Sequence, residues 1–246
     1  MSTLSWYCKW AVRTLRYEGL HLLLWRFLKL CLLPLGNLGF AVFYQKDLTK
    51  PIQEIRAKVD LTVGPATKSE IDQLTWLVAL RYGPVKNLEW YSRLGIRETI
   101  LERFRKGQKC FVGRIGAEIV HYNWIFFNLE ESVPRTGCFI RLKEEEALMN
   151  DAFTIEALRG KNVHGAVHSQ MLLFLQRAGY RRAYTIVSSN KSSRKTLGRV
   201  IWEPLGIMLY FIPRGAKRAW IGRIKGTLKP FANRQDPDQE GVIGNL

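Results

Sequence analysis

One stretch of the chain, residues 146–209, limits the possible folds more than any other. It begins with a strand-like apolar run, Ala147–Ile155, and continues into a glycine-containing loop, Arg159–Gly165. Apolar residues then recur at helical spacing as far as Gly179, a residue type that commonly ends a helix. The next segment, Arg181–Ser188, is rich in β-branched and aromatic residues and predicts a second strand. This order predicts a β-α-β unit with a right-handed crossover.

The charge of this stretch favours an anionic ligand. Nine Lys or Arg residues and no Asp or Glu lie between Arg159 and Arg199. A loop with glycine at Gly160 and Gly165 that opens into a helix presents free backbone N–H groups at the positive end of the helix dipole. Ringed by cations, such a loop suits a multiply phosphorylated cofactor. The alternative is that a basic protein simply has a basic pair of helices.

The loop Arg159-Gly160-Lys161-Asn162-Val163-His164-Gly165 resembles the acyl-CoA loop of the GNAT acyltransferase superfamily, whose usual form is Arg/Gln-x-x-Gly-x-Gly/Ala. Asn190 and the helix expected after it resemble the segment that follows the fifth strand of that family. The resemblance covers about Leu61–Ile212. The loop departs from the pattern at Asn162, where Gly is usual, and at His164, where Gly or Ala is usual. Because Asn tolerates left-handed backbone angles, Asn162 can keep the shape of the loop.

The resemblance implies an α/β (α+β) fold with a mixed, mostly antiparallel central sheet and flanking helices. It implies that acetyl-CoA or another acyl-CoA binds as co-substrate, with its pyrophosphate on the loop amides and its pantetheine arm in a splay between the fourth and fifth strands. No metal is implied. The residues expected to bind the cofactor are Thr154, Ile155, Arg159, Gly160, Lys161, Asn162, Val163, His164, Gly165 and Asn190.

Acyl transfer from a thioester needs a base for the proton of the acceptor, and three residues are candidates. Asp151 lies in the expected fourth strand near the mouth of the splay, and Glu156 lies at the end of that strand, just before the loop. His121 lies in an expected hairpin strand. Each of these residue types is more often structural than catalytic, so none is singled out. His168 is expected on the exposed surface of the helix that follows the loop.

The chain is expected to have three parts. Residues 1–58 carry nine cations and three anions, and near the N-terminus the cations and the apolar residues lie on opposite helical faces. This pattern predicts amphipathic helices in a membrane interface, followed by a linker. The alternative is a pair of helices packed on the protein's own core or on a partner subunit. Residues 59–213 form the GNAT-like domain, and residues 214–246 a basic C-terminal helix and polar tail.

Within the central part, further elements follow from pattern and turn residues. Leu61–Thr67 reads as a short strand and turn, after which Thr67 or Ser69 would cap a helix. A second helix runs through Tyr91–Arg105, and Lys109–Phe127 reads as a β-hairpin. Ile201–Ile212 fits one or two closing strands.

Composition narrows the class of protein. A hydrophobic content of 47% over 246 residues supports a packed core and excludes wholesale disorder. The formal charge of +17 favours polyanionic partners such as an anionic membrane surface or nucleic acid. The four cysteines form no CxxC or Cys/His pattern, so neither a metal site nor a disulfide framework is expected. Reduced thiols fit a cytoplasmic setting.

These observations lead to a first hypothesis and two rivals. The first is a cytoplasmic, peripherally membrane-associated acyl-CoA-dependent acyltransferase that modifies an amine or hydroxyl of a small molecule or glycan. Its membrane placement suggests a lipid-linked sugar or cell-envelope precursor as the acceptor. The rivals are an aminoacyl-tRNA-dependent transferase on the same fold, and a non-catalytic member that binds lipid or nucleic acid. The sequence leaves the oligomeric state open.

Overall fold

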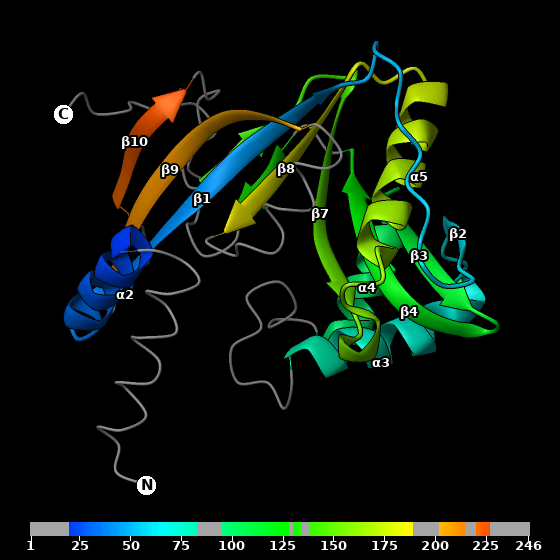
Figure 1. Cartoon of the computed structure of the whole chain (residues 1–246), viewed down its shortest axis with the longest axis horizontal. Helices are drawn as coiled ribbons and strands as arrows, with labels where there is room; N and C mark the ends of the chain where they lie inside the picture. Colours follow the sequence, from blue (N-terminus) through cyan, green and yellow to red (C-terminus); the bar gives the residue numbers. More distant parts are fainter. Residues whose placement is uncertain are drawn as a thin grey trace, which may run out of the picture.

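A computed structural model of the chain describes residues 20–82, 95–127, 130–133, 138–188, 202–214 and 220–226. Its main feature is an eight-stranded sheet with strand order β10-β9-β1-β8-β7-β4-β3-β2 (Figure 1). The strands are β1 (Gly36–Asp47), β2 (Thr62–Pro65), β3 (Lys109–Ile115), β4 (Glu118–Phe126), β5 (Glu130–Val133), β6 (Cys138–Arg141), β7 (Glu146–Thr154), β8 (Arg182–Ser188), β9 (Glu203–Pro213) and β10 (Trp220–Gly226). The helices are α2 (Leu20–Leu32), α3 (Ile71–Tyr82), α4 (Ile96–Arg105) and α5 (Val163–Arg177), with short 3₁₀ turns η1 (Lys68–Glu70) and η2 (Glu156–Leu158).

The predicted mixed, mostly antiparallel sheet with flanking helices is confirmed. All the pairings in the main sheet are antiparallel except that of β7 with β8. Helices α3 and α4 cover one face, and α5 covers the other (Figure 1). Strands β5 and β6 form a separate two-stranded sheet.

The sequence explains how the sheet acquires two buried faces. On β4, Tyr122 and Trp124 belong to the core shared with α3 and α4, while Ile125 belongs to the core shared with α5. This alternation follows from the two-residue period of a strand. In α5, Val163, Val167, Met171 and Leu175 recur every four residues, and all four are buried. The predicted helix end is confirmed, since Gly179 has a φ of 85° just beyond α5.

Strands β7 and β8 pair only at their beginnings. The ladder joins Glu146–Leu148 to Arg182–Tyr184, and no pairing follows it. Beyond this point β8 pairs with β1 on its other edge as far as Ser188. The two strands therefore diverge, as Figure 1 shows between the labels β7 and β8.

The prediction that residues 1–58 are a separate helical region is wrong for β1. This strand lies inside the main sheet, between β8 and β9. Gly39 makes the position possible, because a Cβ there would overlap the ring of Tyr210 on β9. The apolar run that resembled an interfacial helix is instead buried by strands that come much later in the chain. The residues just before β1 do form a helix, α2, as expected.

The predicted C-terminal basic helix is also corrected. Residues 220–226 form β10, which pairs with the edge of β9. Two glycines in this segment, Gly222 and Gly226, disfavour a helix, and pairing with an available strand edge outweighs the helical spacing of the charges. The helix expected after Asn190 and residues 83–94 lie outside the described residues. None of the described helices is long and apolar enough to cross a bilayer.

Candidate functional site

The loop between β7 and α5 has the backbone conformation expected of an anion-binding turn. Gly160 has a φ of 81°, and Asn162 has a φ of 66° and a ψ of 14°. The prediction that Asn162 would adopt the left-handed conformation is thus confirmed. Helix α5 begins at Val163 with no side-chain cap and no acidic residue in its first turn. Its first backbone N–H groups therefore have no intrahelical acceptor and carry the positive end of the helix dipole.

The segment before β2 fixes this loop in place. The Asn162 side-chain amide donates to the Arg56 carbonyl at 3.3 Å, and the Lys58 amide donates to the Lys161 carbonyl at 2.8 Å. Ile55 packs over the first turn of α5, where a Cβ on Gly165 would lie 3.2 Å from its Cγ2 atom. The predicted linker is consequently docked along α5, and the glycine at position 165 allows the close approach.

The two cations of the loop are exposed. Arg159 lies above the ring of Phe153, with 6.0 Å between its Cζ atom and the ring centroid, and 3.6 Å from the carboxylate of Glu156. The Glu156 side chain is 89% exposed. Glu156, a predicted catalytic residue, therefore lies in solvent outside the loop, whereas Arg159 and Lys161 flank the helix start as an anion site requires.

His121, another predicted catalytic residue, lies in the interior beside residues predicted to bind the cofactor. It is fully buried on β4, with its Nδ1 atom 2.7 Å from the Thr154 hydroxyl and its ring 5.3 Å from that of His164. Burial lowers the pKa of His121 well below its usual value, and the nearby His164, His168 and Arg81 add to the effect. The imidazole is therefore neutral near pH 7, as a proton acceptor must be.

His121 is one end of a row of four rings that we call the histidine row: His121, His164, His168 and Trp202. Ring centroids lie 5.1 Å apart between His164 and His168 and 5.2 Å apart between His168 and Trp202. His164 turns inward toward the sheet, where burial lowers its pKa to about 4. Within the described residues, no group of His, Cys, Asp and Glu side chains is arranged to hold a metal ion.

The expectation that His168 would be a surface residue is wrong. Its side chain is only 2% exposed, because it lies one turn after His164 on the face of α5 that packs against β4. The Asn123 side-chain nitrogen lies 3.3 Å from His168 Nδ1. Since that nitrogen can only donate, the contact assigns the histidine proton to Nε2.

Several buried polar atoms along this row have no hydrogen-bond partner among the described residues. They are His121 Nε2, Asn123 Oδ1, His168 Nε2 and Trp202 Nε1. Leaving a buried donor or acceptor unpaired costs roughly 1–3 kcal/mol, so such atoms are rare unless a ligand or water completes them. Four in one place indicate a site for a polar guest on the α5 side of the sheet.

The gap between β7 and β8 supplies main-chain partners for such a guest. Past Leu148 on β7 and Tyr184 on β8, neither strand has a ladder partner across the divergence. Exposed strand edges carry alternating N–H and C=O groups that pair with an extended amide chain. An extended ligand with amide groups therefore fits between these strands.

Asp151 lies on the opposite face of the sheet from the histidine row. It has a φ of 57° at a bulge where β7 shifts register against β4. Its carboxylate forms ion pairs with Arg81 and with Arg103, the latter at 2.6 Å. These contacts occupy both carboxylate oxygens and hold the bulge in shape. The structure does not bring Asp151, Glu156 and His121 together, and Asn190 lies outside the described residues.

The sequence analysis did not identify His168, Trp202 or Arg103 as residues of this region. The role of His168 could have been inferred, because it lies four residues after His164 in a predicted helix and therefore on the same helical face. Trp202 and Arg103 gave no signal, because strand order and helix packing bring them to the site from distant parts of the chain.

Comparison with known proteins bears on the fold. Neither a protein-family model nor a curated protein matches the sequence. A solved structure of a GCN5-related N-acetyltransferase from Sphaerobacter thermophilus matches with a TM-score of 0.51 at 10% identity, over 82% of this chain and 57% of that one. A protein of unknown function from Staphylococcus epidermidis matches with a TM-score of 0.48 at 10% identity, over 76% of this chain and 64% of that one. An N-acetyltransferase from Staphylococcus aureus matches with a TM-score of 0.44 at 14% identity, over 57% of this chain and 82% of that one.

The chain thus spans less than two thirds of the first two of these proteins. The similarity concerns architecture, since the identities are low. The chain has the fold of the GCN5-related N-acetyltransferase (GNAT) superfamily.

Proposed function

We propose that this protein is an acyl-CoA-dependent acyltransferase that modifies an amine or hydroxyl group. The observation that carries the proposal is the divergence of β7 and β8 next to the uncapped, cation-flanked start of α5. A slot for an extended amide chain and a seat for a diphosphate lie side by side there. Acyl-CoA combines these two groups in one molecule.

The residues present suit both the diphosphate and the pantetheine arm of acyl-CoA. Arg159, Lys161 and the loop amides from Gly160 to Gly165 would hold the diphosphate. Thr154 and Ile155, at the end of β7, would border the path of the pantetheine arm, and Asn190 remains a proposed contact. The unpaired atoms of the histidine row can bind the polar groups of the arm or the waters around it. When bound, acyl-CoA supplies the activated acyl group.

Among the predicted bases, His121 fits the chemistry best. In this proposal Nδ1–H donates to the Thr154 hydroxyl, so that the Nε2 lone pair faces the unpaired atoms of the row. His121 Nε2 then takes the proton that the acceptor loses as its nitrogen or oxygen bonds to the acyl carbon. The carbon–sulfur bond breaks, and the leaving thiolate is protonated from solvent or from the imidazolium. Asp151 and Glu156 are the alternative bases, and Asp151 shapes the bulge in either case.

The finer proposal concerns the acceptor and the place of action. Acyl-CoA is a cytoplasmic metabolite, so we propose a cytoplasmic enzyme attached peripherally to the membrane. A lipid-linked sugar or cell-envelope precursor would be within its reach there. The exposed apolar residues of α2 and the charge of +17 support this location. The charge alone would equally suit a tRNA substrate, which steeply salt-dependent tRNA binding would reveal.

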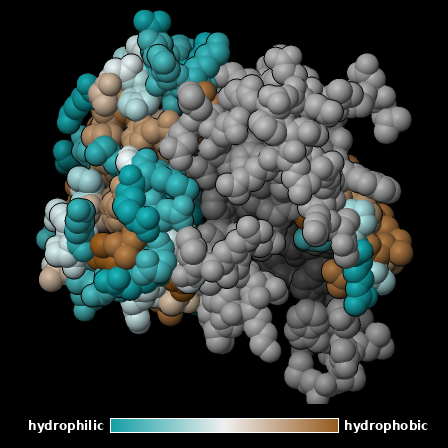
Figure 2. Space-filling view, turned by 180° about the vertical axis from the view of Figure 1, so that it is seen from behind, coloured by the Kyte–Doolittle hydropathy of each residue, from teal (hydrophilic) through white to brown (hydrophobic). Residues whose placement is uncertain are grey.

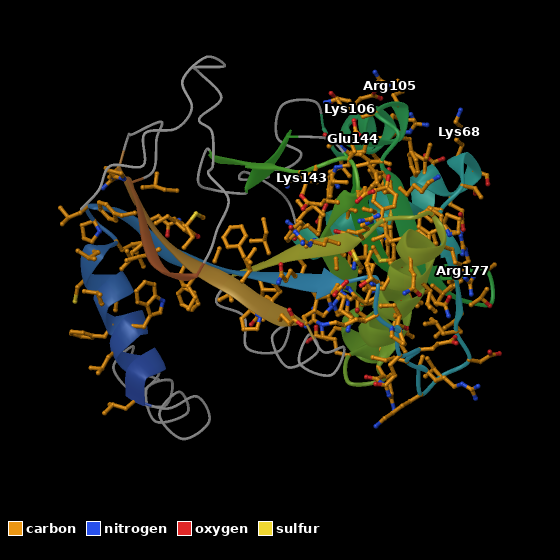
Figure 3. All side chains as sticks on the ribbon, turned by 90° about the horizontal axis from the view of Figure 1, so that it is seen from above. Lys68, Arg105, Lys106, Lys143, Glu144 and Arg177 are labelled. Carbon is orange, nitrogen blue, oxygen red and sulfur yellow. The ribbon has the colours of Figure 1, made fainter. Side chains whose placement is uncertain are left out.

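Thermal unfolding with and without acyl-CoA tests the proposal. Acetyl-CoA or a longer acyl-CoA should raise the Tm of the full chain, and Arg159→Ala with Lys161→Ala should abolish the shift. A matched control is Lys143→Ala with Arg177→Ala, which removes two exposed cations outside the loop (both labelled in Figure 3). The absence of a shift with every acyl-CoA tried, or equal loss in the control, contradicts the proposal. Mass spectrometry of copurifying small molecules would identify the acyl group.

A further inference from the structure

Helix α2 presents a large apolar surface to solvent. Its face formed by Leu20, Leu24, Phe27 and Leu28 is 46–63% exposed. We call these four residues the apolar face of α2. Leu30, Leu33 and Leu35 next to it are similarly exposed. Among the described residues, the other exposed large hydrophobic side chains are Trp76 and Leu80 on α3 and Ile115 at the end of β3. Contiguous apolar surface of this kind marks a binding site.

The opposite side of α2 attaches the helix to the sheet. Trp25 is partly buried and meets the ring of Phe40 on β1 edge-on, with the centroids 5.3 Å apart. Figure 1 places α2 at the end of the sheet formed by β1, β9 and β10, far from α5. The space-filling view shows hydrophobic atoms gathered at that same end (Figure 2). The apolar face is therefore held outward on a fixed support.

Charge indicates which partner this end of the molecule prefers. From residue 19 to residue 45 the sequence contains Arg26 and Lys29 and no Asp or Glu. The neighbouring strand β10 contributes Arg223 and Lys225, again without an acidic residue. An apolar helical face in a segment whose charged residues are all basic is typical of sequences that bind anionic lipid, where each cation contributes about 1 kcal/mol.

The length of α2 determines how it can meet a membrane. Thirteen residues correspond to a helix of roughly 20 Å, whereas the hydrocarbon core is roughly 30 Å thick. A helix this short, fixed to a sheet along one side, can lie in the interface but cannot cross it.

We propose that the apolar face of α2 docks on an anionic lipid bilayer, with its leucine and phenylalanine side chains at the boundary between headgroups and acyl chains. The sheet end that carries β1, β9 and β10 faces the membrane, and the loop before α5 remains in water. This inference rests on the membrane attachment proposed above and names the surface that makes it. It does not depend on the transfer chemistry, because it concerns the opposite end of the molecule.

Vesicle flotation of the full chain tests this proposal. Vesicles of phosphatidylcholine mixed with phosphatidylglycerol should carry the protein upward, and vesicles of phosphatidylcholine alone should carry little. Leu24→Glu with Phe27→Glu should weaken binding more than about tenfold, because two apolar side chains lose their lipid contact. The matched control is Trp76→Glu with Leu80→Glu, which changes two side chains of α3 that are 61% and 51% exposed.

The control variant should float like the wild type, and all variants should keep the wild-type circular dichroism because the changed side chains are exposed. Flotation of Leu24→Glu with Phe27→Glu at the wild-type level overturns the proposal. A second result would also overturn it: the wild type binds neither vesicle type and is a dimer by light scattering, while Leu24→Glu with Phe27→Glu is a monomer. In that case the apolar face binds a second copy of the chain.

Discussion

The rings of His168 and Trp202 lie 5.2 Å apart, although α5 carries the first and the segment just before β9 carries the second. In the sheet, β1 and β8 separate β9 from β7. Trp202 therefore joins the segment before β9 to α5, although two strands of the sheet lie between β9 and β7. Both rings have a nitrogen without a partner, His168 Nε2 and Trp202 Nε1. A guest between β7 and β8 would meet these two donors together.

Replacing Trp202 by Phe tests whether its N–H serves a ligand. Because one hydrogen bond contributes about 1 kcal/mol, Trp202→Phe should weaken acyl-CoA binding about fivefold in isothermal titration. Trp124→Phe is the matched control, since Trp124 is also buried with an unpaired Nε1, but on the face that packs against α3 and α4. Equal weakening in both variants would show that the N–H of Trp202 has no special role.

Replacing His121 by Gln tests the proposed base. Transfer to a panel of amines and amino sugars should fall roughly 10²–10⁴-fold while acyl-CoA affinity is kept. Because burial lowers the pKa of His121, the wild type should retain activity below pH 6.5, where an ordinary histidine is protonated. An unchanged rate in His121→Gln would move the role to Asp151 or Glu156, which Asp151→Asn and Glu156→Gln then distinguish.

The histidine row should make stability depend on pH. Burial lowers the pKa of His164 to about 4 from an ordinary value of 6.5, and the pKa values of His121 and His168 are lowered too. Between pH 6.5 and pH 4 the histidines of the unfolded chain therefore bind protons that those of the folded chain do not. The free energy of unfolding is therefore greatest above pH 6.5 and falls as the pH is lowered from there toward 4.

Urea unfolding between pH 7 and pH 5 measures this dependence. His164→Phe should reduce the slope by at most about 1.4 kcal/mol per pH unit, the contribution of one titrating group. The chosen range stays above the titration of Glu70, whose pKa is lowered to about 2 chiefly by its hydrogen bonds with Arg114. A stability that rises toward pH 5 would show that the row is charged in the folded protein.

Asn162 offers a test of the loop conformation. Its φ of 66° suits Gly and Asn, whereas Ala in this region is strained by roughly 1–2 kcal/mol. Asn162→Ala should therefore lower the Tm, and Asn162→Gly should lower it much less. Similar values for the two variants would mean that the hydrogen bond of Asn162 to the Arg56 carbonyl, and not its backbone angle, matters most.

The sequence predicted those features that depend on neighbouring residues, and it did not predict those that depend on contacts between distant segments. The strand, loop and helix from Glu146 to Arg177 follow local patterns, and so does the left-handed Asn162. The strand β1 could not be recognised, because a short apolar run suits a buried strand and a buried helix alike, and its partners β8 and β9 lie far away in the sequence. The same holds for β10 and for the burial of His168.

The place of β1 in the sheet also affects how the chain can fold. The strand is synthesised well before both of its neighbours, β8 and β9. This half of the sheet therefore cannot form until β9 has been synthesised, and it depends on contacts of long sequence separation that form slowly. A chain shortened to begin at residue 58 would leave the edges of β8 and β9 bare, and such edges pair with other molecules and aggregate.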